Sequence, residues 1–266
     1  MPYDEFSDFS VAISDGIATL AFDRPDIRNG ISPDTMRQMQ RLWVMLDEDP
    51  AVRAIILTGN GAKFSVGGDF GAMKSGPWRN PFEGDTFAEA TRRVDDQLRV
   101  RVPVIAAVNG DVIGGGATIA LLCDLVIMDE TARIGDPHVR AGAVAGDGGC
   151  AIWMALCGPL RAKEYLMTGD LLTAAEAERI GLVNRVVAQG TAYEEAVRIA
   201  RRFADGDLPP LAVKWTKYSI NKMIRESLAS SLDVSLALEL LSFLSEDRAE
   251  AVASFLEKRK GHFVGR

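Results

Sequence analysis

The sequence predicts a protein of the α/β class, and three observations support this prediction. In the first half of the chain, short runs of apolar and β-branched residues alternate with segments whose apolar residues recur at helical spacing. Two of the apolar runs, at 54–58 and 104–108, are followed by the same order of residues: Asn-Gly, a short stretch, then Gly-Gly. After Gly148 the pattern is mainly helical. A chain of 266 residues has room for one large domain, or for a domain with a helical appendage.

The first half begins with an expected hairpin, whose strands at 9–14 and 17–22 flank Asp15-Gly16. Ser32 and Pro33 are typical of a helix start. That helix has apolar residues at helical spacing and therefore a buried face: Met36, Met39, Leu42, Trp43 and Leu46. The remaining elements are expected as strands at 53–58, 104–108, 125–128 and 132–134, and helices at 87–100 and 115–122.

The second half is expected to hold two helices, 151–156 and 161–167, on either side of Gly158-Pro159. A short helix capped by Thr173 and a strand at 183–187 follow, and then four helices at 193–204, 210–225, 228–244 and 247–260. The 228–244 segment is rich in Leu and Val, so we expect it to pack against the core or a neighbouring subunit.

Composition limits the function classes. The formal charge of -7 and the pI of about 5.0 argue against nucleic acid or an anionic membrane as the main partner. Three cysteines without metal-ligand spacing read as reduced thiols, and the acidic N-terminus lacks a signal-peptide pattern. The longest apolar stretch, 117–128, is too short to span a bilayer. We therefore expect a cytoplasmic protein without a metal site.

The two glycine turns suggest a binding site for one oxygen atom. Each leads from a strand into a stretch that can start a helix, and a helix start has backbone N–H groups without partners. If the turns lie side by side, two such groups could face one oxygen, as in an oxyanion hole. The alternative is that both are tight turns that pack helices onto a sheet.

The chain resembles the crotonase family, which includes enoyl-CoA hydratases and isomerases. Motifs over nearly the whole chain carry the resemblance: Arg24-Pro25, Arg28-Asn29-Gly30-Ile31, Ala54–Gly59, Phe64, Gly67-Gly68-Asp69, Pro103–Gly110, Gly114-Gly115-Gly116, Leu166–Asp170, Ala174–Ala177, Gly181-Leu182-Val183 and Phe255–Lys260. The resemblance implies a spiral of β-β-α units with a C-terminal helical trimerisation region, often doubled to a hexamer. We place the crotonase-like core at 1–204 and the helical oligomerisation region at 205–266.

The resemblance also implies a substrate and its contacts. The substrate would be an acyl-CoA thioester, so coenzyme A would enter as part of the substrate and no prosthetic group is expected. The thioester oxygen would lie between the backbone N–H groups of Gly68 and Gly115. Contacts with the coenzyme A moiety would fall on Arg28, the Val66 backbone and Lys258, with Lys63 as a further local cation.

The catalytic residues depart from the usual pattern of the family. Typical hydratases hold a water between two glutamates, one acting as base and one as acid. The corresponding positions are Thr118 and His138, so neither carboxylate is present. Hydration by the paired-glutamate route is therefore in doubt.

Two other groups could transfer protons. Asp147 lies between glycines, where some isomerase branches of the family place an acidic proton shuttle, although it could instead cap the helix that follows. His138 could act as base, acid or water-positioning group, or only line the pocket wall. The turn residues Asp111 and Asp69 are expected to be mainly structural, and Asp136 is expected to cap a helix at Pro137.

Three functions follow from these residues. The first is enoyl-CoA double-bond isomerisation with Asp147 as the shuttle. The second is a hydratase or other lyase, a hydrolase or a decarboxylase that uses His138 with Asp147. The third is a non-catalytic acyl-CoA binder. The segment 73–86 is expected to form a mobile loop over the site, with four bulky residues that could line an acyl pocket: Met73, Trp78, Phe82 and Phe87.

Overall fold

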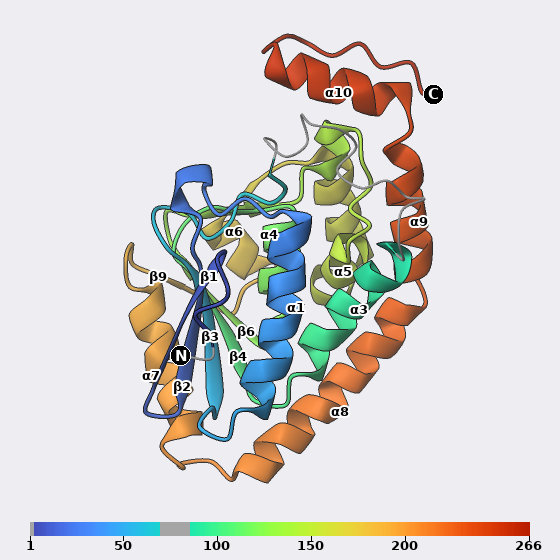
Figure 1. The fold of residues 1–266 in the computed structure, drawn as a ribbon. Coiled ribbons are helices and arrows are strands. Elements are labelled where there is room, and N and C mark those ends of the chain that lie inside the picture. The colour runs from blue at the N-terminus through green and yellow to red at the C-terminus, as the bar shows by residue number, and fades with distance from the viewer. Residues whose placement is uncertain (1–2, 70–85) are drawn as a thin grey trace.

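The computed structural model describes residues 3–69 and 86–266, with the side chains of 86–90 left out. Its centre is a six-stranded sheet in the order β1-β2-β3-β4-β6-β9 (Figure 1). The hairpin strands pair antiparallel and all later strands pair parallel. The strands are β1 Phe9–Ser14, β2 Ile17–Phe22, β3 Ala54–Gly59, β4 Val104–Val108, β6 Leu125–Asp129 and β9 Arg185–Val187. The predicted α/β class is confirmed.

A second, smaller sheet lies beside the first and contains β5 (Val112–Ile113), β7 (Arg133–Gly135) and β8 (Leu172–Thr173). The bridge between Ser65 and Val112 brings the first glycine turn alongside β5. The two glycine turns are therefore connected to each other at β5.

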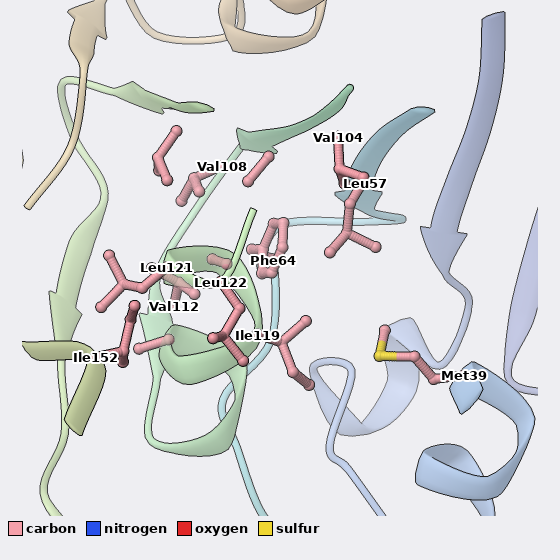
Figure 2. Packing of buried hydrophobic residues seen from close by; sticks show 14 of the residues in the cluster. Met39, Leu57, Phe64, Val104, Val108, Val112, Ile119, Leu121, Leu122 and Ile152 are labelled. Carbon is pink, nitrogen blue, oxygen red and sulfur yellow. The ribbon is translucent and has the colours of Figure 1, made fainter. Parts of the chain in front are cut away.

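Helices cover both faces of the central sheet, because successive strand residues point to opposite faces. On one face, alternate residues such as Ile56 and Ile105 pack against α7 (Ala192–Ala204). On the other face, Leu57 and Val104 belong to the larger core that includes α1 (Pro33–Glu48) and α4 (Gly115–Leu121). Figure 2 shows this second core around Phe64, with Ile119 and Leu122 of the α4 segment on one side and Met39 of α1 on the other.

Local sequence explains the helix boundaries. Ser32 accepts a hydrogen bond from Thr35 N while Thr35 Oγ1 accepts one from Ser32 N, which is a reciprocal cap for α1. Thr173 caps α6 (Ala174–Arg179), as expected. The predicted break at Gly158-Pro159 lies inside α5 (Gly149–Thr168), where Gly158 leaves the helical conformation at φ 76° and ψ 167°. The two short helical segments are η1 (Pro25–Ile27) and η2 (His138–Ala141).

The C-terminal helices pack against their own chain. They are α8 (Pro210–Ala229), α9 (Leu232–Ser242) and α10 (Glu246–Leu256), and α8 runs along α3 (Thr86–Arg99) in Figure 1. Lys217 Nζ donates to Asp124 Oδ2 at 2.6 Å and to Val102 O at 2.7 Å, which fixes α8 to the core. The single helix expected at 228–244 is wrong. Its first residues end α8, and α9 begins after a break at Ser230 and Ser231.

Candidate active site

The two glycine turns lie side by side because they follow neighbouring parallel strands. β3 and β4 pair in register at Ile56 and Ile105, so their carboxyl ends meet at one edge of the sheet. Ile113 N, in the second turn, donates to Ser65 O in the first at 2.9 Å. A Cβ atom on Gly67 would lie 2.7 Å from Ile113 O and 3.5 Å from Gly115 N. Only a residue without a side chain permits this approach.

The amide groups of Gly68 and Gly115 make no hydrogen bond within the described residues. Gly67 O and Asp69 N on either side of Gly68 both bond to Ile31, so the Gly68 N–H faces away from Ile31. Gly115 is the first residue of α4, where a helix leaves its N–H groups without an internal partner.

Both glycines line one cavity, of about 140 Å³. One part of its wall is apolar and comes from the faces of α1, α3 and the α4 segment that meet there: Met36, Met39, Trp43, Val94, Ile119 and Leu122. Another part comes from η2 and from the C-terminal helices: His138, Ala141, Leu236, Glu239, Leu240, Phe243 and Arg248. The cavity therefore combines an apolar chamber with a charged wall.

Asp147 faces the second glycine turn from the loop before α5. Its Oδ2 lies 3.1 Å from the position that a Cβ on Gly115 would occupy. Its Oδ1 accepts long hydrogen bonds of 3.4 Å from Thr118 Oγ1 and from Gly149 N. The N-cap position of α5 is Gly148, without a side-chain cap, so Asp147 makes only a long contact with the start of that helix. Its side chain lines the cavity.

His138 lines the same cavity, within 4.8 Å of Asp147 and in contact with Asp136. Its Nδ1 contacts Asp136 Oδ1, and its Cε1 lies 3.6 Å from the position that a Cβ on Gly114 would occupy. Asp136 also accepts from His138 N at 3.3 Å, so the expected cap is a weaker contact than the one with the imidazole ring. Burial by itself would lower the pKa of His138. The charge of Asp136 and its hydrogen bond, with smaller contributions from Asp147 and Glu239, raise that pKa to about 10. The contacts around the ring therefore favour the charged form of the imidazole.

The cavity residues Glu239 and Arg248 were not identified from the sequence. Both come from the region that was assigned to oligomerisation. The signal for Glu239 was its place in a helix that is otherwise rich in Leu: it is an acid only 4% exposed on the buried side of α9. Arg248 donates to Ala141 O in η2 and lies 5.2 Å from the ring of Phe243.

The residues expected to contact coenzyme A lie on two parts of the surface. Val66 lines the cavity, and its N–H donates to the carbonyl of the exposed Arg28 at 3.2 Å. Lys258 is exposed just after α10, whose neighbour is η2. Lys63 binds Asp111 at 2.8 Å, and Asp111 also binds Arg133. Met73, Trp78 and Phe82 lie outside the described residues, as does the side chain of Phe87.

Asp136, His138 and Asp147 approach within 4.8 Å of one another, a spacing that a metal ion could also use. Nδ1 of His138 is already in contact with Asp136 Oδ1, and we assign no ion to the three residues. In the part of the chain that the structure covers, no helix has the length and apolarity needed to cross a membrane.

Comparisons with known proteins identify the family of the chain. A family model described as enoyl-CoA hydratase/isomerase matches residues 12–266. A probable enoyl-CoA hydratase from Rhizobium meliloti is 34% identical over 250 residues, which cover 94% of this chain and 95% of that protein. A short-chain-enoyl-CoA hydratase from Clostridium acetobutylicum is 36% identical over 250 residues, covering 92% of each chain.

Solved structures give the same result. The crystal structure of an enoyl-CoA hydratase/isomerase from Mycobacterium paratuberculosis superposes with a TM-score of 0.88 at 35% identity. The match covers 95% of this chain and 100% of that one. Paired glycine turns over a cavity, a fold shared with solved relatives and a family match along almost the whole chain lead to one conclusion: the protein is an enzyme of the enoyl-CoA hydratase/isomerase family.

Proposed function

We propose that the enzyme shifts a double bond in an enoyl-CoA thioester, with Asp147 as the proton shuttle. The observation that carries this proposal is the position of Asp147 Oδ2 beside Gly115, in the cavity that Gly68 also lines. The thioester oxygen binds between the two amide N–H groups. Asp147 removes a proton from the α-carbon and returns it at the γ-carbon.

The charges around the cavity support this assignment. The dienolate formed in the first step places negative charge on the thioester oxygen, where two N–H donors stabilise it. His138, as an imidazolium within 4.8 Å of Asp147, stabilises the ionised carboxylate that the first step requires. The apolar chamber lined by Met39, Trp43 and Leu122 accommodates the acyl chain.

Hydration is the second candidate, and the presence of both Asp147 and His138 in the cavity favours it. Typical hydratases carry glutamates at the positions of Thr118 and His138. Asp147 accepts a hydrogen bond from Thr118, so its carboxylate lies beside the first of these positions, and His138 occupies the second. Asp147 would then take a proton from water, and His138 would give one to the α-carbon. Relatives named crotonyl-CoA hydratase and short-chain-enoyl-CoA hydratase support this candidate.

The test compares Asp147→Asn, His138→Ala and wild type on a 3-enoyl-CoA and on crotonyl-CoA. For isomerisation, Asp147→Asn should lower kcat by about 10²–10⁴-fold, the range for a lost acid–base group, while binding of saturated butyryl-CoA is retained. Asp205→Asn, at the exposed end of α7, is the matched control. Wild-type isomerisation by Asp147→Asn would exclude the shuttle role. Crotonyl-CoA hydration by the wild type that is lost in both His138→Ala and Asp147→Asn, without isomerisation of the 3-enoyl-CoA, would favour the second candidate.

We also propose the surroundings of the reaction. Arg28, the Val66 backbone and Lys258 contact the coenzyme A moiety, and the region 205–266 assembles the chain into a homotrimer or a dimer of trimers. Exposed apolar residues on one face of α8 support the assembly, since Leu211, Trp215 and Tyr218 recur at helical spacing.

A further inference from the structure

Asp136 is the most deeply buried acid of the site, and neither proposed reaction uses it. Its side chain is 0% exposed. Oδ1 contacts the ring of His138, while Oδ2 is buried without a hydrogen-bond partner among the described residues. A Cβ on Gly149 would lie 2.5 Å from Oδ2, so the packing around this oxygen depends on a glycine. A buried carboxylate with one unsatisfied oxygen is costly, and such a cost calls for an explanation.

The local geometry places Asp136 where its carboxylate can fix the orientation of the His138 ring. The two residues are separated only by Pro137, at φ -86° and ψ 26°, and Asp136 Oδ1 accepts from both His138 N and the ring. With Nδ1 bound on one side, Nε2 is on the opposite edge of the ring. His138 lines the cavity with its side chain 19% exposed, and Nε2 makes no hydrogen bond to a described residue.

Charged groups face this ring from each neighbouring element. Asp147 comes from the loop before α5 and Glu239 from α9. Arg248 of α10 lines the same cavity, and Cys150 lies on the first turn of α5. Burial, followed by the charges of Asp136, Asp147 and Glu239, raises the pKa of Cys150 to about 11, so this thiol is neutral. Of these groups, only Asp136 contacts Nδ1.

We propose that Asp136 is a positioning residue, which holds the His138 ring through Nδ1 and directs its Nε2–H into the cavity toward the thioester. The proposal deepens the proposed function, on which it rests. His138 then provides a fixed cation beside the enolate in the isomerisation. In hydration, Nε2 gives its proton to the α-carbon, Asp147 takes one from water, and transfer from Asp147 back to His138 restores both groups. Asp136 and His138 are separated only by Pro137, so one short segment carries both the cation, His138, and its counterion, Asp136.

The test uses histidine NMR on the full-length enzyme. The chain has two histidines, so protein labelled with ¹³C-histidine gives two ring signals, which His262→Gln assigns. We expect His138 to titrate near pH 10 in wild type and about 1–3 pH units lower in Asp136→Asn, which keeps the shape but removes the charge. The alkaline limb of the kcat profile should move by the same amount, while KM stays unchanged.

Two results would overturn the proposal. One is a wild-type His138 that titrates at or below its ordinary value, a measurement whose only variant is His262→Gln at an exposed position. The other is an Asp136→Asn enzyme whose kcat falls equally at every pH while the ring titration stays in place, since this is the behaviour of a merely structural residue. The NMR titration requires no substrate. It therefore tests the role of Asp136 even if the enzyme does not catalyse the proposed isomerisation.

Discussion

The close approach of the two glycine turns predicts a specific cost for adding one methyl group at Gly67. This residue has φ +78°, where an L-residue other than glycine costs about 1–2 kcal/mol. The added Cβ would also lie 2.7 Å from Ile113 O, and overpacking of this kind costs about 1–3 kcal/mol. Gly67→Ala should therefore lower the free energy of unfolding by about 2–5 kcal/mol, from the backbone and steric costs together.

The same methyl group should also impair catalysis. Relief of the clash moves the turn that carries Gly68 away from Gly115, and loss of one oxyanion donor lowers kcat by about 10²–10³-fold. Gly190→Ala is the matched control, because Gly190 has φ +80° but a Cβ there meets nothing within 4 Å. Urea unfolding and steady-state kinetics on the enoyl-CoA substrate measure both effects. Equal stability losses in the two variants, with a wild-type kcat for Gly67→Ala, would show that the turns do not form a shared oxyanion site.

Two further predictions concern stability and assembly. Because the folded-state pKa of His138 is raised, its pairing stabilises the fold fully below its ordinary pKa of about 6.5, and this contribution is lost as the pH rises to about 10. The contribution is on the order of 5 kcal/mol. The unfolding free energies of wild type and His138→Gln should therefore converge by about that amount between pH 6 and pH 10.5. Curves that stay parallel over this pH range would contradict the ion pair. For assembly, light scattering should give three times the 28.8 kDa chain mass or a multiple of it, and Trp215→Asp with Tyr218→Asp should give monomers. Val44→Asp on α1 is the control for an exposed apolar site, and a monomeric wild type would refute the assembly.

The sequence predicted the fold class and most element positions, because these depend on local pattern. Helical spacing of Met39, Leu42 and Leu46 located the buried face of α1, and Ser32 marked its start. The prediction failed at 228–244, where leucines recur on both sides of the break at Ser230 and Ser231. A pattern of this kind shows burial but does not show where one helix ends and the next begins.

The sequence also indicated the main residues of the candidate site. The resemblance to the crotonase family implied Gly68 and Gly115, and the absence of both glutamates usual in that family directed attention to Asp147 and His138. What these groups can do depends on contacts between distant segments. The approach of Thr118 and Gly115 to Asp147 joins α4 to the loop before α5, some 30 positions later in the chain.

The sequence by itself determined an α/β chain with two glycine turns and an unusual set of proton-carrying side chains. Only the tertiary structure decided that α9 and α10 return to the same cavity, with Glu239 and Arg248 in its wall. It also decided the charge of His138, since that charge depends on burial and on carboxylates from three separate segments. The physical reason is that periodicity and turn chemistry act between neighbours in sequence, whereas a pKa and a cavity depend on everything nearby in space.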